Sequence, residues 1–203
     1  AMEIDRVVPM IEAIHAAMPN MPISIDTYHS AVAKAAIDAG ASIVNDISCG
    51  NFDSKMISTV VANQVGYIGM HQTGNPSTMH EVQNRSDIMK TMIDYFNEKK
   101  KQFAAIGLTQ WIIDPGFGFS KTKAENFELV KSLAQLKALD LPILLGLSRK
   151  SSIYKTLGVD AEAALNGTTV LNTIGLMGGA NILRVHDVKE AKEAIILINE
   201  MNA

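Results

Sequence analysis

The sequence has little cysteine, few aromatic residues, no excess of one charge and no long apolar run. A single cysteine, Cys49, rules out a disulfide within the chain and is typical of a reducing, cytoplasmic compartment. Lys and Arg (18) nearly balance Asp and Glu (21), so neither nucleic acid nor an anionic membrane is an expected partner. No apolar run reaches the roughly 18 residues that a bilayer-spanning helix needs. The charged residues Glu3, Asp5 and Arg6 near the start are not typical of a signal peptide.

What the sequence does contain is an alternation of short apolar segments and amphipathic ones. The chain has 203 residues and 47% hydrophobic content, which is enough to bury a core, and we expect residues 1–203 to form a single domain. Strands are predicted at 23–27, 43–46, 67–70, 111–114, 143–147 and 182–186. Helices are predicted at 4–18, 32–39, 56–63, 88–106, 124–138, 161–177 and 188–201, and a polar loop at 72–84. Near-continuous apolar strands that alternate with helices predict a parallel sheet covered by helices.

Such a sheet has two possible arrangements, an open doubly wound sheet or a closed barrel. The strand–helix turns contain no G-x-G-x-x-G motif, which weakens the nucleotide-binding open sheet. Every predicted strand ends in polar residues, which favours an α/β fold of the TIM (β/α)8 type, whose active sites lie at the carboxyl ends of the strands. About six of the eight strands are predicted here, so we expect the domain to be N-terminally incomplete, without a first strand, its helix and a second strand.

The segment Trp111 to Thr122, WIIDPGFGFSKT, is the clearest candidate for a site. Its apolar start predicts a short buried strand that ends at the carboxylate of Asp114. Pro115 ends the strand, and Gly116 and Gly118 let a ligand approach the backbone closely.

Polar residues at the other strand ends extend this site. They are Asp26, Asn45, Asp46, His71, Asp114, Ser148, Arg149, Lys150, Arg184 and His186. Acidic and amide groups come from the earlier strands and cations from the last two, which predicts a ligand with a flat, N–H-rich head and an anionic tail. Simpler interpretations stay open. Asp26 and Asp46 could cap the following helices, His186 could be structural, and Arg149 could point away from the site while Lys150 points into it.

Taken together, these residues resemble the dihydropteroate synthases, folate-pathway members of the pterin-binding barrel family. The matching motifs run in order along the chain: Ser24 to Thr27 (SIDT), Ile43 to Ser48 (IVNDIS), Met70-His71, Asp114 to Lys121 (DPGFGFSK), Gly146 to Ser151 (GLSRKS) and Arg184 to Val188 (RVHDV).

The resemblance implies a role for each matching residue. Pterin would be bound by Asp26, Asn45, Met70, Asp114, Gly146 and Lys150. Pyrophosphate would be bound by Asn45, Arg184 and His186, and p-aminobenzoate by Phe119, Ser148 and Lys150. Asp26, Asp114, Lys150 and Arg184 would be the catalytic residues.

The implied reaction joins 6-hydroxymethyl-7,8-dihydropterin pyrophosphate to p-aminobenzoate with Mg²⁺, in a cytoplasmic homodimer that is a sulfonamide target. The family's Asn-x-Thr-Pro-Asp-Ser-Phe and Thr/Ser-Arg-Pro-Gly loops are absent from these residues, and the first of them carries the metal-binding asparagine. We therefore expect no metal ligand in this chain. Alternatives are a corrinoid-linked methyltransferase that uses methyltetrahydrofolate, a Schiff-base aldolase that uses Lys150, and a non-catalytic pterin-binding protein.

Overall fold

A computed structural model describes residues 2–74, 77–78 and 85–201 of the chain. The chain divides into two compact units. The first unit comprises residues 1–71 and 97–113, and the second comprises residues 72–96 and 114–203. The prediction of one domain over residues 1–203 stays a prediction. Part of the predicted loop at 72–84 lies outside the described residues.

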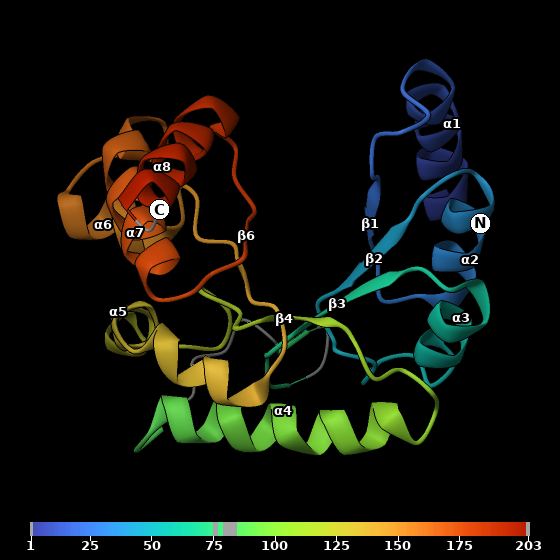
Figure 1. Ribbon diagram of the computed structural model, residues 1–203, viewed down its shortest axis with the longest axis horizontal. Helices are drawn as coiled ribbons and strands as arrows, with labels where there is room; N and C mark the ends of the chain where they lie inside the picture. Colours follow the sequence, from blue (N-terminus) through green and yellow to red (C-terminus); the bar gives the residue numbers. More distant parts are fainter. Residues whose placement is uncertain (1, 75–76, 79–84, 202–203) are drawn as a thin grey trace. The chain divides into compact units, whose positions relative to one another are not determined.

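The first unit alternates helices and short strands (Figure 1). Its elements are α1 (Met2–Ala17), β1 (Ser24–Asp26), α2 (Ser30–Asp38), β2 (Ile43–Asp46), α3 (Met56–Asn63) and β3 (Gly66–Met70). The strand order is β1-β2-β3-β4, and the β1–β2 and β2–β3 pairs are parallel, as predicted. Figure 1 shows α1, α2 and α3 on one side of β1, β2 and β3. Helix α4 (Ile88–Ala104) and strand β4 (Ile112–Asp114) are divided between the units at Phe96 and Ile113.

Aromatic residues and a small thiol fill the core of the first unit. The ring of Phe103 lies 4.9 Å from that of Trp111 and 5.8 Å from that of Tyr67, in edge-on contacts. Cys49 is fully buried, and a Cβ placed on Gly69 would come within 2.6 Å of its Sγ atom. Only glycine fits at position 69 without moving this cluster, because backbone and ring atoms approach each other so closely there.

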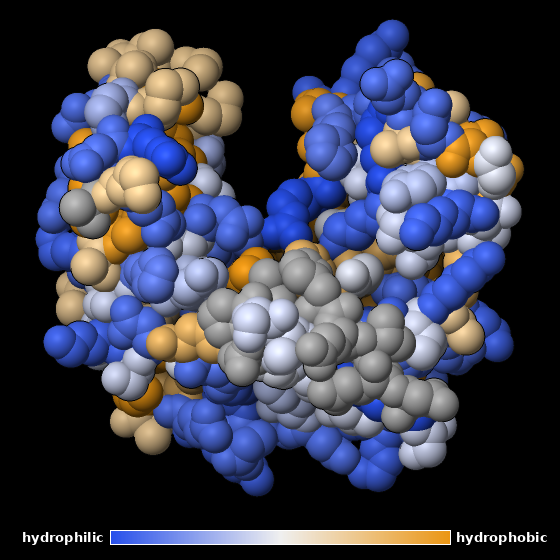
Figure 2. Space-filling view, turned by 180° about the vertical axis from the view of Figure 1, so that it is seen from behind, coloured by the Kyte–Doolittle hydropathy of each residue, from blue (hydrophilic) through white to orange (hydrophobic). Residues whose placement is uncertain are grey.

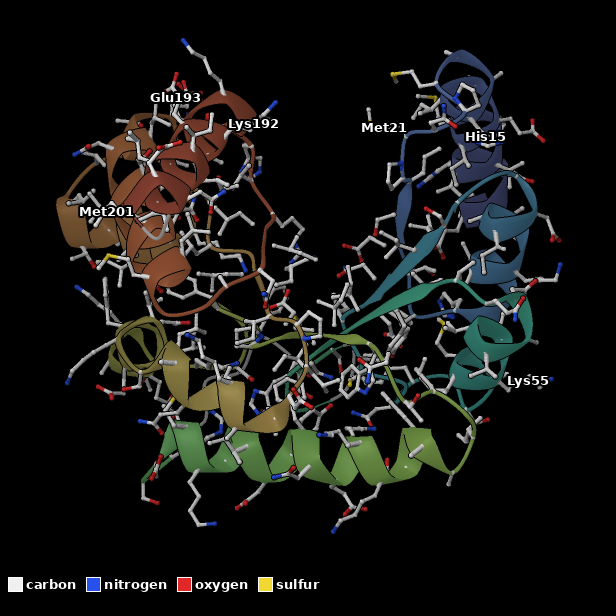
Figure 3. The ribbon with its side chains drawn as sticks, viewed as in Figure 1. His15, Met21, Lys55, Lys192, Glu193 and Met201 are labelled. Atoms are coloured by element: carbon white, nitrogen blue, oxygen red, sulfur yellow. The ribbon has the colours of Figure 1, made fainter. Side chains whose placement is uncertain are left out.

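Exposed methionines lie on α1 and on the turn that follows it. Met10, Met18 and Met21 are 62%, 47% and 52% exposed, and Figure 2 shows mildly hydrophobic side chains, drawn in tan, over this end of the first unit. His15, labelled beside Met21 in Figure 3, packs on Gly40, where a Cβ would come 2.6 Å from its ring. His15 is therefore a packing residue.

The second unit is mainly helical around one pair of strands (Figure 1). Its elements are α5 (Lys123–Lys131), the 3₁₀ segment η1 (Leu133–Leu139), β5 (Leu144–Leu145), α6 (Ser151–Leu157), the 3₁₀ segment η2 (Glu162–Ala164), α7 (Leu165–Met177), β6 (Ile182–Leu183) and α8 (Val188–Met201). β5 and β6 are parallel, and α7 and α8 lie side by side. Helix α5 begins with a capping box, in which Thr122 and Glu125 bind each other's backbone N–H.

Several predicted boundaries are wrong. The helix predicted at 124–138 is interrupted at Ser132, and α6 was not predicted, because it has seven residues and buries only Ile153. The strands predicted at 143–147 and 182–186 pair over two residues each. No helix within the described ranges has the length and hydrophobicity needed to cross a membrane.

Candidate active site

In the first unit, three of the predicted site residues lie at the carboxyl ends of neighbouring strands. The register of the parallel pair places Asp26 of β1 opposite Asn45 of β2, so their side chains are neighbours. Met70 is the last residue of β3. Asp26 is exposed, whereas Asn45 and Met70 are buried. The adjacency predicted for Asp26 and Asn45 is therefore present.

Asp46, the next residue after Asn45, has a structural role instead. Its carboxylate accepts hydrogen bonds from Ser48 N (2.8 Å), Ser48 Oγ (2.7 Å), Gly50 N (2.9 Å) and Tyr67 Oη (2.9 Å). Asp46 thus folds the loop after β2 and is not the cap of α3, whose N-cap residue is Lys55. The backbone N–H of Ser30, at the start of α2, donates to Asp53 Oδ2 at 2.7 Å. The pattern of polar residues at strand ends did not indicate this role for Asp53.

In the second unit, the loop from Asp114 to Thr122 is stabilised by hydrogen bonds among its own residues. Asp114 is 1% exposed, and its Oδ1 accepts a hydrogen bond from Gly116 N at 2.7 Å. Lys121 is 4% exposed, and its ammonium donates to the carbonyl oxygens of Gly116 (3.0 Å) and Phe119 (3.2 Å). Burial lowers the pKa of Lys121 to about 7. The sequence motif alone did not single out Lys121, because most lysines are solvated.

Residues outside this loop also form hydrogen bonds that stabilise it. Asn126 Oδ1 accepts from Gly118 N at 2.6 Å, and Arg85 donates to Ser120 O at 2.8 Å and to Thr73 Oγ1 at 3.0 Å. Gly116 and Gly118 have φ values of 69° and 83°, which favour glycine. The predicted tight loop is therefore present and rigidly connected.

Lys150 reaches onto this loop from the N-terminus of α6. Its Nζ atom donates to the carbonyl oxygen of Phe117 and lies 4.7 Å from the centroid of the Phe119 ring. A Cβ at Gly118 would come 3.0 Å from Lys150 Cδ, so the glycine leaves room for the lysine. Burial lowers the pKa of Lys150 to about 8. Lys150 and Phe119 are thus brought together, as predicted.

Arg184 lies against the carboxylate of Asp114. Its Nη2 is 3.2 Å from Asp114 Oδ2, and a Cβ at Gly146 would come 3.0 Å from the same nitrogen. The guanidinium therefore lies over the backbone of Gly146. His186 donates from its backbone N–H to Ser148 Oγ at 3.2 Å, and its Nδ1 is 2.9 Å from that oxygen.

These residues line a pocket of about 160 Å³, formed by Gly146, Ser148, Lys150, Arg184, Val185 and His186. Its side-chain polar groups are two cations, an imidazole and a hydroxyl, with no carboxylate among the lining residues, so these groups suit an anion. Arg149 does not line it. Its guanidinium makes a bidentate ion pair with Asp187, at 2.9 and 2.7 Å, so Arg149 points away while Lys150 faces the pocket. In the described part of the chain, no three His, Cys, Asp or Glu side chains are grouped so that they could hold a metal ion.

Comparison with known proteins identifies the family. The family model described as pterin binding enzyme matches residues 1–186. The chain is 38% identical to the dihydropteroate synthase of Synechocystis over 92% of its own length, and 36% identical to that of Escherichia coli over 97%. The chain belongs to the dihydropteroate synthase family. It spans 65% of the Synechocystis protein and 70% of the Escherichia coli protein.

Solved structures of the family have the same fold. A Yersinia pestis dihydropteroate synthase with a sulfonamide drug complex superposes with a TM-score of 0.93 at 32% identity. The superposition covers 98% of this chain and 73% of the Yersinia pestis chain. The Xanthomonas albilineans dihydropteroate synthase in complex with 7,8-dihydropteroate gives 0.90 at 30% identity, with 98% and 74% covered. The predicted α/β fold class of the TIM (β/α)8 type, with six strands among the described residues, is therefore confirmed.

Proposed function

We propose that the chain catalyses the dihydropteroate synthase reaction, with pyrophosphate leaving from the pocket of the second unit. The observation that supports this most strongly is the position of Arg184, over Gly146 and beside the Asp114 carboxylate. One cation thus lies between a buried acid and an anion-sized pocket. Membership of the family supports a transferase activity.

The pyrophosphate end of the substrate would be held by Arg184 and His186. The hydroxyl of Ser148 fixes His186 through two contacts, which leaves the imidazole oriented at the pocket wall. In the reaction, the bond between the pterin methylene carbon and the pyrophosphate oxygen breaks, and the electron pair leaves with pyrophosphate. Positive groups fixed at the departing oxygens stabilise the developing charge.

The pterin end would be held by carboxylate and amide acceptors. Asp26, Asn45 and Asp114 suit the N–H groups of the pterin ring, and Met70 suits its flat face. The Asp114 carboxylate lies 3.2 Å from the Arg184 guanidinium, and it would stabilise the cationic pterin that remains when pyrophosphate leaves. Gly146 would contribute to this end by leaving room for the Arg184 guanidinium beside Asp114.

The aminobenzoate end would use Phe119, Ser148 and Lys150. The Phe119 ring lies against the Lys150 ammonium. The ring of an aromatic acid would pack on Phe119, and its carboxylate would pair with Lys150. Its amine nitrogen then forms the new bond to the methylene carbon and releases one proton. This gives 7,8-dihydropteroate without a covalent enzyme intermediate.

The implied Mg²⁺ finds no suitable site in the described residues. The anion pocket presents arginine, lysine, histidine and serine, whereas Mg²⁺ requires oxygen ligands and in protein sites is usually held by carboxylates together with substrate phosphates. We propose that any Mg²⁺ arrives with the pyrophosphate of the substrate. No step described above passes through it.

We further propose a homodimer in the cytoplasm. Its support is the exposed apolar surface of α7 and α8, where Ile174, Met177, Leu197 and Met201 are 42%, 65%, 65% and 72% exposed. Figure 3 shows Lys192 and Glu193 pointing outward from α8, so the polar edge of that helix would remain in water. The cytoplasmic location is supported by the lone, buried Cys49. We also propose that sulfonamides bind at the aminobenzoate end, where Phe119, Ser148 and Lys150 would contact them.

Calorimetric titration with the pterin pyrophosphate tests the proposed function. Asp114→Asn is expected to weaken binding by about tenfold to a hundredfold, because hydrogen bonds to a charged acceptor are lost. Asp38→Asn, at an exposed carboxylate that pairs with Lys34, is the matched control and is expected to bind within about twofold of wild type. Equal binding by wild type and Asp114→Asn would reject the proposed site.

A further inference from the structure

The strand pair β5–β6 is short. Beyond its last backbone hydrogen bond, side-chain contacts hold the two segments together. Only Leu144 with Ile182 and Leu145 with Leu183 are paired, followed by one hydrogen bond from Arg184 N to Leu145 O at 3.0 Å. Beyond this point, Ser148 on one segment contacts His186 on the other. These two segments carry most of the lining of the anion pocket.

The next residue on each segment forms an ion pair. Arg149 Nε lies 2.9 Å from Asp187 Oδ2, and Arg149 Nη2 lies 2.7 Å from Asp187 Oδ1. The Arg149 Nη1 atom donates to the carbonyl oxygens of Ala161 and Glu162, so the guanidinium is bound on three sides. The side chains are 23% and 18% exposed. A bidentate pair of this kind fixes orientation as well as distance.

The backbone of Arg149 is held in an unusual conformation. Its φ is 55°, in the left-handed region that favours glycine, and its N–H donates to Thr168 Oγ1 at 3.0 Å. This conformation lets Ser148 and Lys150 both line the pocket while the residue between them points elsewhere. An arginine persists in such a conformation only when its surroundings hold it there.

We propose that Arg149 and Asp187 act as a clamp that keeps the two walls of the anion pocket in register. They are positioning residues, since neither lines the pocket, and they act through Ser148 and His186. This inference rests on the proposed function of the pocket as the pyrophosphate site. Breaking the clamp should weaken binding of the anion and leave binding of a pterin without pyrophosphate unchanged.

A double-mutant cycle read by calorimetry tests the clamp, with inorganic pyrophosphate and 6-hydroxymethylpterin as probes. Arg149→Gln and Asp187→Asn are each expected to weaken pyrophosphate binding about tenfold, and the double variant no more than about twofold further, because both changes break one interaction. Arg149→Lys, which keeps the charge but not the bidentate geometry, should also lose most of the affinity. The pterin probe should bind all of these variants as it binds wild type.

The exchanged pair Arg149→Asp with Asp187→Arg provides a rescue. Asp tolerates the left-handed backbone at position 149 better than most residues, so we expect pyrophosphate affinity within about threefold of wild type. Lys189→Gln with Glu193→Gln, which breaks an exposed pair on α8, is the control and should change nothing.

Three outcomes would overturn the clamp. They are single variants that bind pyrophosphate like wild type, losses that multiply in the double variant, and equal losses for both probes. Folded wild-type protein that binds no pyrophosphate would instead reject the proposed function, and the clamp's role with it. Circular dichroism of each variant shows whether it is folded.

Discussion

Replacing Lys121 with methionine is expected to flatten the pH dependence of stability above neutral pH. The Lys121 side chain is buried beneath the loop at 116–119, and burial lowers its pKa from 10.5 to about 7. The folded protein therefore releases a proton from Lys121 near neutral pH, while the unfolded chain keeps that proton until about pH 10.5. Where the unfolded state binds more protons, the free energy of unfolding rises with pH.

The size of the effect follows from the two pKa values. The charged form of Lys121 destabilises the fold most below about pH 7, and this penalty falls as the pH rises toward 10.5. Between about pH 7 and pH 9, wild type should gain roughly 2 kcal/mol in its free energy of unfolding from this group alone. Methionine has no proton to exchange, so the variant should lack this gain. Above about pH 7, where the amine is neutral, the variant should also lose stability because the carbonyls of Gly116 and Phe119 lose their donor.

Urea unfolding followed by circular dichroism at several pH values measures the slope. Lys131→Met, at an exposed lysine of α5, is the matched control and should keep the wild-type slope. If Lys121→Met and wild type gained the same stability over this range, Lys121 would be charged in the folded protein at neutral pH. The description of the loop as closed around a neutral amine above about pH 7 would then be wrong.

Four other substitutions test the geometry in and around the site. Gly146→Ala should push the Arg184 guanidinium away from Asp114, because its Cβ would lie 3.0 Å from Nη2, and weaken pterin pyrophosphate binding by roughly tenfold in calorimetry. Wild-type affinity for that substrate should fall as the pH rises through about 8, where Lys150 loses its proton, whereas Lys150→Arg should bind more weakly but without this decline. Asp46→Asn should lower the free energy of unfolding by about 2–4 kcal/mol, since four donors converge on the carboxylate, and Tyr67→Phe by only about 1 kcal/mol. Unchanged affinities or melting curves would contradict the respective contacts.

Local sequence patterns predicted the regular elements well where apolar periodicity was strong. The helices at 56–63 and 188–201 begin and end where the pattern indicates. The pattern also predicted Asp114 at a strand end and Lys150 beside Phe119. The first depends on a short-range feature, a buried run that ends in a carboxylate. The second follows from the expectation that the ends of parallel strands meet at one edge of a sheet.

What the patterns missed depends on contacts between distant parts of the chain. Asp46 has the same strand-end position as Asn45, and only the loop at 48–50 and Tyr67 make it structural. The clamp joins residues 149 and 187, and no spacing rule links positions that far apart. The buried state of Lys121 likewise follows from how the loop folds around it.

The most direct test of the proposed reaction is pyrophosphate release from 6-hydroxymethyl-7,8-dihydropterin pyrophosphate, with and without p-aminobenzoate. We predict release that requires p-aminobenzoate, yields 7,8-dihydropteroate in equal amount, and is lost in Asp114→Asn but kept in Asp38→Asn. No release by folded protein that still binds the pterin pyrophosphate would contradict the proposed catalysis by this chain.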